Sequence, residues 1–343
     1  MLTKAAILYE INKPLVIDTI KLPPLKDSQV LVKIAYSGIC QGQLLEIKGF
    51  KGEDKYLPHC LGHEASGVVV EIGKGVTKVK ANDKVALTWI KGVGLDGFGC
   101  VCECSGKKIN AGPISTFSEY SIISENRLYK VKSDISMEEI ALLGCAIPTG
   151  LGSVLNIAKP KKNQSIAVFG CGGIGLLAIQ GAKISGCSSI VAIDLFDNKL
   201  QIAKKMGATH TINASKYSKE HLTELIKTEL DFAIESSGSP KAMLHSLESI
   251  RPRGGTAVIL GNTHHEDVIK INPKHFNLGK RILGSWGGEC MPDQDYPFFE
   301  KLIEEKKLDL TFLTNDKYHL DDINQAIKDV EMGKATRALI SFE

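Results

Sequence analysis

The sequence predicts an α/β protein that combines a β-rich part with a doubly wound parallel sheet. In the first 150 residues, apolar and alternating runs lie between turn residues, as is typical of strands. After residue 150, short apolar strands alternate with helical patterns, which indicates parallel strands joined by crossover helices. The 33 glycines among 343 residues suit a fold with many tight turns, and this length is usual for two domains.

In the β-rich part, strands are predicted over residues 30–35, 65–72 and 84–89. Residues 91–115 are rich in glycine and irregular, so we expect a surface lobe there. Residues 295–343 hold two amphipathic helices and a final strand over 338–342, and we expect this tail to return to the β-rich part. The predicted domains are therefore 1–150 together with 290–343, and 151–289.

The alternation that predicts the parallel sheet runs from residue 165 to residue 260. Strands are predicted over 165–170, 189–194, 211–213, 231–235 and 256–260, and helices over 173–184, 198–206, 221–228 and 240–250. A further strand over 281–287 would form the edge of this sheet. Strands that alternate with helices in this way build a doubly wound sheet.

Composition and charge exclude several classes of partner. The net charge is +3, and no basic or acidic block is longer than a few residues, so we expect neither nucleic acid nor a membrane surface as a partner. No apolar run reaches the length of a membrane span, and the first residues lack the features of a signal peptide. We therefore expect a cytoplasmic protein whose nine cysteines are thiols or metal ligands rather than disulfides.

The segment FGCGGIG carries the pattern G-x-G-x-x-G at Gly170, Gly172 and Gly175. It follows a predicted strand and opens a predicted helix, and Asp194 ends the next strand. The first glycine permits a tight turn, the second lets the backbone approach a pyrophosphate, and the third lets helix and strand pack closely. A glycine-rich turn without a ligand is the alternative, but the full context favours a dinucleotide site.

This motif also predicts which dinucleotide is bound. The free N–H groups at the start of the helix, those of Gly173 and Ile174 included, would hold the phosphates. Asp194 would accept hydrogen bonds from the adenosine ribose. A 2′-phosphate would meet this carboxylate without a compensating arginine, because Leu195 and Phe196 follow. The sequence therefore favours NAD over NADP.

Cys40, His63 and Cys145 are scattered in the sequence, but each lies where a predicted element begins or ends. Two thiolates and one imidazole would leave one tetrahedral position open, as a catalytic zinc ion requires. The alternatives are ordinary ones, since a lone cysteine is usually a small buried hydrophobe and a lone histidine is usually structural. Residue types alone leave this choice open.

Taken together, these residues resemble the zinc-dependent medium-chain alcohol and polyol dehydrogenases, and the resemblance extends over essentially the whole chain. SGIC, GHE, GC-x-x-x-TG, FGCGGIG and DNKLQIAKKMGAT follow one another in the family order. The resemblance implies a GroES-like β-rich catalytic domain, an inserted Rossmann domain, one catalytic zinc ion per chain and hydride transfer with NAD.

The resemblance implies a role for each matching position. Cys40, His63 and Cys145 correspond to the catalytic zinc ligands, and Glu64 corresponds to an acid that can approach the metal. Three further positions would contact the cofactor: Thr149 at the nicotinamide, Lys199 at the adenosine ribose and Arg337 at the pyrophosphate. For Arg337, a solvated arginine of the tail is the alternative.

Three positions depart from the family pattern. Gly42 stands where the family has the serine or threonine that passes the substrate proton outward. Gln43 replaces the aspartate that supports the histidine ligand; it can still accept a hydrogen bond from His63 but brings no charge. The lobe that holds a structural zinc in the family has only Cys100, Cys102 and Cys104, so we expect free thiols in a surface loop instead of a second zinc. Cys60, near His63, is interpreted as core packing.

The predicted function is a zinc-dependent transfer of hydride between NAD and an alcohol. Without a hydroxyl at Gly42, the substrate proton could pass to Glu46, to Glu64, to a water chain or to a second hydroxyl of the substrate. The last route favours a small polyol, cyclitol or sugar. The alternatives are a zinc-free quinone or enone reductase of the same superfamily and a non-catalytic NAD-binding regulatory protein. We expect a homodimer that forms through the edge strand over 281–287; a tetramer is the alternative.

Overall fold

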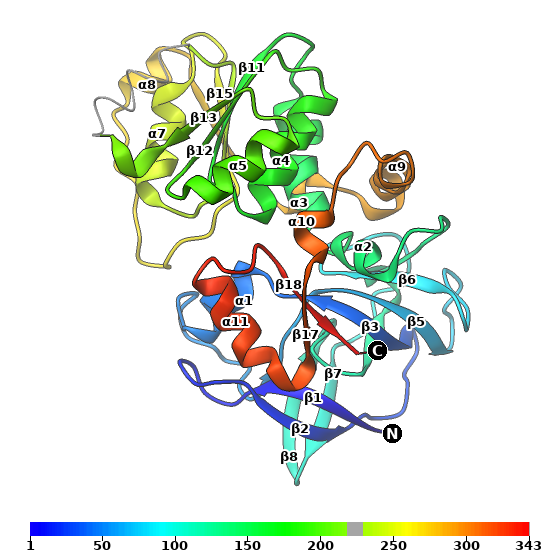
Figure 1. Cartoon of the computed structure of the whole chain (residues 1–343). Coiled ribbons are helices and arrows are strands. Elements are labelled where there is room, and N and C mark those ends of the chain that lie inside the picture. Colours follow the sequence, from blue (N-terminus) through cyan, green and yellow to red (C-terminus); the bar gives the residue numbers. More distant parts are fainter. Residues whose placement is uncertain (218–228, 343) are drawn as a thin grey trace. The chain divides into compact units, whose positions relative to one another are not determined.

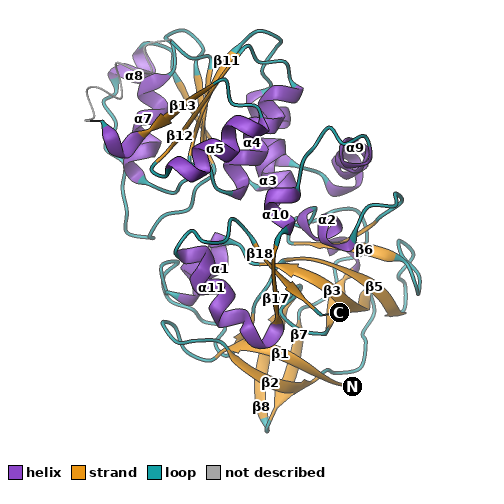
Figure 2. Ribbon diagram, viewed as in Figure 1, coloured by secondary structure: helices purple, strands orange, loops and turns teal. Residues whose placement is uncertain are grey.

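The computed structural model describes residues 1–217 and 229–342, which form two compact units (Figure 1). Unit 1 comprises Met1–Cys145 and Met291–Glu343, and unit 2 comprises Ala146–Cys290. The helix predicted over 221–228 lies outside the described residues. Unit 1 is largely β-structure, whereas unit 2 alternates strands with helices (Figure 2).

The strands of unit 1 form a closed barrel and a larger sheet. The barrel consists, in spatial order, of β1 (Leu2–Leu8), β2 (Val16–Lys21), β7 (Cys100–Cys104), β8 (Lys107–Gly112) and β4 (His59–Cys60). The larger sheet consists, in spatial order, of β10 (Leu128–Lys130), β6 (Lys84–Thr88), β5 (Glu64–Ile72), β3 (Gln29–Gly38), β18 (Ala338–Ser341) and β17 (Asp316–His319), with β9 (Tyr120–Ser124) also paired to β3. The predicted strands over 30–35, 65–72 and 84–89 are present, each close to its predicted bounds.

The last strand of the chain lies in this larger sheet. β18 pairs antiparallel with β3, so that Leu339 is opposite Gly38, and it pairs parallel with β17. The tail therefore completes a sheet that the N-terminal part begins. The helices of unit 1 are α1 (Gln41–Ile47), α2 (Met137–Leu142), α9 (Pro292–Glu304), α10 (Thr311–Thr314) and α11 (Ile323–Glu331). Among the described residues, no helix has both the length and the apolarity that crossing a bilayer requires.

The expectation of a surface loop for Cys100, Cys102 and Cys104 was wrong. These residues form strand β7, which pairs with β8, and alternate side chains along it are buried. All three cysteines lie in the barrel core, where Cys60 packs against them. The segment CVCEC alternates with period two, and cysteine behaves as a small hydrophobe, so the pattern of a half-buried strand was present in the sequence. None of the three cysteines forms a disulfide.

Unit 2 is built on a six-stranded parallel sheet. Its spatial order is β13 (His210–Asn213), β12 (Ser189–Asp194), β11 (Ser165–Phe169), β14 (Phe232–Glu235), β15 (Thr256–Ile259) and β16 (Arg281–Gly284). Every neighbouring pair is parallel. Within the described residues of this unit, the α-helices are α3 (Ala146–Gly152), α4 (Gly173–Ile184), α5 (Asp197–Met206), α7 (Pro240–Ser249) and α8 (Lys274–Asn277). The prediction of a doubly wound parallel sheet is confirmed, and its strand order reverses direction between β11 and β14, where such sheets bind ligands.

Candidate active site

Unit 1 brings together Cys40, His63 and Cys145, whose ligand atoms all lie within 4.8 Å of one another. Cys40 precedes α1, His63 lies between β4 and β5, and Cys145 follows α2. Three segments that are far apart in the sequence thus converge on one point. No other predicted ligand belongs to this group, and the carboxylate of Glu64 lies outside it.

Two glycines let the backbone carry these residues close together. Gly62 has φ of +98°, and a Cβ atom there would lie 2.8 Å from the N atom of Phe117. A Cβ atom on Gly144 would lie 2.8 Å from the Cα atom of Glu64, so this residue must also be glycine for the chain to approach β5. The hydroxyl of Thr88 donates a 2.8 Å hydrogen bond to the carbonyl oxygen of Gly144 and fixes that approach. The glycines that precede His63 and Cys145 are therefore required for steric reasons.

The donor set fits a zinc ion. A hydrogen bond from the Cys145 thiol, with Arg337 and His63 nearby, holds the pKa of Cys40 well below its usual value, while the same interaction raises the pKa of Cys145. The atom Nε2 of His63 is buried and makes no hydrogen bond of ordinary geometry within the described part of the chain. A thiolate, a second cysteine and an imidazole nitrogen are ligands that zinc prefers.

The side-chain amide of Gln43 contacts both Cys40 and His63. Its Oε1 accepts the backbone N–H of Cys40 at 2.6 Å, and its Nε2 lies 2.9 Å from Nδ1 of His63. The expectation that Gln43 accepts from His63 was therefore wrong for this orientation of the amide, because the amide nitrogen can only donate. The oxygen is already engaged at the N-terminus of α1.

Glu64 and Arg337 form a buried ion pair beside the three ligands. Glu64 is fully buried and Arg337 is 4% exposed. Nε of Arg337 lies 2.9 Å and Nη2 lies 2.5 Å from Oε1 of Glu64. Burial raises the pKa of Glu64, and Arg337 acts against this rise. Arg337 thus pairs with the carboxylate through which Glu64 would accept a proton or bind a metal, and that role of Glu64 stays a prediction. The role of Arg337 at the pyrophosphate also stays a prediction.

Glu46 belongs to a second polar group, which we call the Glu46 cluster and define as Glu46, Lys51, Asp54 and His59. Nζ of Lys51 lies 2.9 Å from Oε2 of Glu46, and Nε2 of His59 lies 2.8 Å from Oδ2 of Asp54. The distance between Oε1 of Glu46 and Nε2 of His59 is 3.9 Å. Sequence reasoning selected Glu46 alone, because nothing in the spacing of the other three residues predicts that they meet.

In unit 2, the glycine motif has the geometry that a dinucleotide site needs. Gly170 has φ of +90°, and a Cβ atom on Gly175 would lie 2.8 Å from Oγ of Ser236 and would collide with the carbonyl oxygen of Gly170. A Cβ atom on Gly172, by contrast, would have no atom within 4 Å. Gly172 precedes α4, whose first residues are Gly173 and Ile174. Gly170 and Gly175 are therefore required by the backbone fold, whereas Gly172 leaves open space beside the chain.

The remaining predicted cofactor residues are distributed over unit 2. Asp194 ends β12, and its carboxylate accepts the backbone N–H groups of Cys171 at 2.7 Å and Phe196 at 3.0 Å. Nζ of Lys199 lies 5.1 Å from the ring centre of Phe196. Thr149 lies in α3. Each of these residues keeps its cofactor role as a prediction.

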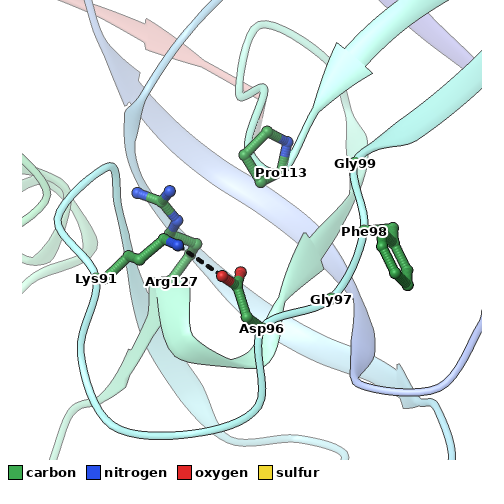
Figure 3. A pocket seen from close by; sticks show the side chains of 7 residues that line it. All are labelled: Lys91, Asp96, Gly97, Phe98, Gly99, Pro113 and Arg127. Carbon is green, nitrogen blue, oxygen red and sulfur yellow. Dashed lines mark hydrogen bonds and ion pairs between the residues drawn. The ribbon is translucent and has the colours of Figure 1, made fainter.

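A surface hollow of unit 1 contains none of the predicted site residues. It is lined by Lys91, Asp96, Gly97, Phe98, Gly99, Pro113 and Arg127, as Figure 3 shows. The side chains of Lys91 and Asp96 point toward each other and form an ion pair of 2.6 Å. The side chain of Arg127 adds a further polar group to this hollow.

Comparison with known proteins gives consistent matches over the whole chain. The model of the alcohol dehydrogenase GroES-like domain matches residues 26–133, and that of the zinc-binding dehydrogenases matches residues 173–305. An alcohol dehydrogenase of Malus domestica is 33% identical over 99% of this chain and 97% of its own length.

Solved structures agree with these matches. The benzyl alcohol dehydrogenase of Acinetobacter calcoaceticus is 26% identical with a TM-score of 0.88, over 100% of both chains. The galactitol-1-phosphate dehydrogenase of Escherichia coli is 26% identical with a TM-score of 0.79, over 98% of this chain and 99% of the other.

Proposed function

Because this chain belongs to the zinc-binding dehydrogenases of the alcohol dehydrogenase type, we propose that it oxidises a hydroxyl group with NAD as the hydride acceptor. The observation that supports this most directly is the convergence of Cys40, His63 and Cys145 within 4.8 Å. A zinc ion held by these residues would act as a Lewis acid and lower the pKa of the substrate hydroxyl. We propose one such ion per chain and no structural zinc ion.

The chain's own residues would bind and orient the reactants. The free N–H groups at the start of α4 and the open space at Gly172 suit the cofactor phosphates, and Asp194 suits the adenosine ribose. Leu195 and Phe196, which follow Asp194, offer no positive charge to a 2′-phosphate, which favours NAD over NADP. Thr149, Lys199 and Arg337 are proposed as further cofactor contacts.

For the substrate, we propose a polar molecule with several hydroxyl groups, such as a polyol, a cyclitol or a sugar. Gly42 brings no hydroxyl group to the space beside the candidate metal ligands, and a second hydroxyl group of the substrate would supply one there. A second proposal concerns assembly: β16 is the last strand of its sheet, and Leu283 and Trp286 at that edge are exposed, which suits a homodimer.

The test combines metal analysis with a substrate panel. Freshly purified protein should hold about one zinc ion per chain, and Cys40→Ser should lose it, while the matched variant Cys187→Ser in unit 2 should keep it. Alcohols, polyols and sugars are then offered with NAD and with NADP, and reduced cofactor is read by absorbance. Protein without metal, or unchanged metal in Cys40→Ser, would contradict the zinc site. Tight NAD binding with no turnover of any alcohol would favour a regulatory protein instead.

A further inference from the structure

Gly42 lies close both to the candidate metal ligands Cys40 and His63 and to a lysine side chain. A Cβ atom built on Gly42 would lie 3.9 Å from Sγ of Cys40, 3.8 Å from Cε1 of His63 and 4.0 Å from Nζ of Lys51. The ammonium group of Lys51 thus lies beside the position from which a residue-42 hydroxyl would reach the substrate. A Cβ atom would fit there, since all three distances are ordinary van der Waals contacts.

Lys51 is held in place by a carboxylate and retains donors for another group. Its Nζ donates to Oε2 of Glu46 at 2.9 Å, and within the described part of the chain this is its one hydrogen bond. An ammonium group has three donors, so two remain for water or substrate. The side chains of Lys51 and Glu46 are 50% and 28% exposed, so this pair also reaches solvent.

The rest of the Glu46 cluster fixes the carboxylate between two nitrogen groups. Nε2 of His59 lies 3.9 Å from Oε1 of Glu46 and donates to Oδ2 of Asp54 at 2.8 Å. Nδ1 of His59 lies 3.3 Å from the carbonyl oxygen of Cys60, which can only accept. One carboxylate oxygen of Glu46 therefore faces His59, and the other accepts the hydrogen bond from Lys51.

We propose that the Lys51–Glu46 pair conducts the substrate proton to solvent, in place of a hydroxyl at residue 42; this inference rests on the proposed function. In oxidation, the substrate C–H bond breaks as its hydrogen leaves with both electrons to the nicotinamide, and the C=O double bond forms. The hydroxyl proton moves to Nζ of Lys51 as Nζ passes one of its own protons to Oε2 of Glu46. Glu46 then gives that proton to water, so Lys51 ends as the ammonium group with which it began.

The test removes the lysine and then restores a hydroxyl. Lys51→Met should lower kcat at least tenfold with little change in KM, and Glu46→Gln should do the same. Adding Gly42→Ser to Lys51→Met should recover most of kcat, because it restores a hydroxyl group at a position where a Cβ atom makes only ordinary van der Waals contacts. Lys48→Met is the matched control, since Lys48 is a nearby lysine that pairs with Glu331 and should leave kcat unchanged.

A second measurement does not depend on turnover. Proton release is followed with an indicator dye when the zinc-loaded protein binds NAD and trifluoroethanol, an alcohol that it cannot readily oxidise. Release should be at least tenfold slower in Lys51→Met and should recover in the double variant with Gly42→Ser. Zinc content is measured in every variant, so that a loss of metal cannot imitate the effect.

The outcomes separate the two proposals. A raised KM with unchanged kcat and unchanged proton release in Lys51→Met would show that Lys51 only anchors the substrate, and would overturn the relay. No rescue by Gly42→Ser would overturn it as well. A parent protein that reduces neither NAD nor NADP with any alcohol would instead contradict the proposed function itself.

Discussion

Replacing Arg337 by methionine should destabilise unit 1 strongly, because it removes the guanidinium group that pairs with the buried carboxylate of Glu64. Both side chains are almost completely excluded from solvent, and Arg337 reaches Glu64 through two nitrogen atoms. Methionine keeps much of the apolar stem of arginine but has no charge. Removing one member of a buried ion pair costs about 3–5 kcal/mol, because the other charge stays in a medium of low polarity.

The size of the effect can be refined with a double-mutant cycle. In a unit of this size each kcal/mol lowers Tm by about 2–4 °C, so Arg337→Met should lower Tm by roughly 6–20 °C. Glu64→Gln should also destabilise, since it leaves Arg337 unpaired. The double variant should lose less than the sum of the single losses, with an interaction energy of about 0.5–3 kcal/mol, because it leaves no unpaired charge.

Urea unfolding of metal-free protein is the assay, with tryptophan fluorescence as the signal. The chain has two tryptophans, Trp89 in unit 1 and Trp286 in unit 2. Trp286 is 71% exposed, so a Trp286→Phe background leaves Trp89 as a reporter of unit 1 at little cost to stability. The ring of Trp89 lies 6.4 Å from that of His63, so it reports directly on the site. A loss below about 1 kcal/mol in Arg337→Met, or strictly additive variants, would refute the reasoning.

Three further predictions concern the glycine motif, an anchoring carboxylate and the metal. Gly175→Ala should destabilise unit 2 by about 1–3 kcal/mol in thermal unfolding, because its Cβ atom collides with the backbone. Gly172→Ala should change stability little but should weaken NAD binding, measured by calorimetry. Equal stabilities of the two variants would contradict this reasoning. Burial would raise the pKa of Glu125, but three backbone N–H groups hold it below its usual value, so its stabilisation is present at neutral pH and is lost as pH falls through this lowered pKa. Glu125→Gln should therefore lose about 1.5–3 kcal/mol at neutral pH, and the difference from the parent in urea unfolding should shrink in acid. Gln43→Glu should raise zinc affinity about tenfold or more in competition with a chelator, since a carboxylate can accept from Nδ1 of His63 while Nε2 binds the metal. An unchanged affinity would contradict the assignment of His63 as a metal ligand supported by residue 43.

Much of the fold was predictable because its signals are local. The strands and helices of unit 2 follow from short-range periodicity, and the predicted helix over 173–184 coincides with α4. The glycine pattern predicts its own turn because two of its members are required by backbone geometry. By contrast, β7 was not predicted, because its alternating apolar residues are cysteines, which were interpreted as possible metal ligands and not as core residues of a strand.

The candidate site was predictable only where residues had a recognisable spacing or resemblance. Cys40, His63 and Cys145 were selected in that way, and the structure places them together. Lys51 and His59 carried no such signal, because a charged residue in a loop is usually solvated. The amide orientation of Gln43 was also beyond sequence reasoning, since it depends on which neighbour takes the oxygen.

The pairing of β18 with β3 has a consequence for synthesis on the ribosome. Unit 2 is one continuous stretch and can fold as soon as residue 290 has emerged, whereas unit 1 needs the last strand of the chain. Until then, the end of β3 next to Cys40 is an open sheet edge, and Glu64 lacks Arg337. The nascent protein therefore completes unit 2 first and unit 1 last. A chain cut short near its C-terminus would retain the former and lose the latter.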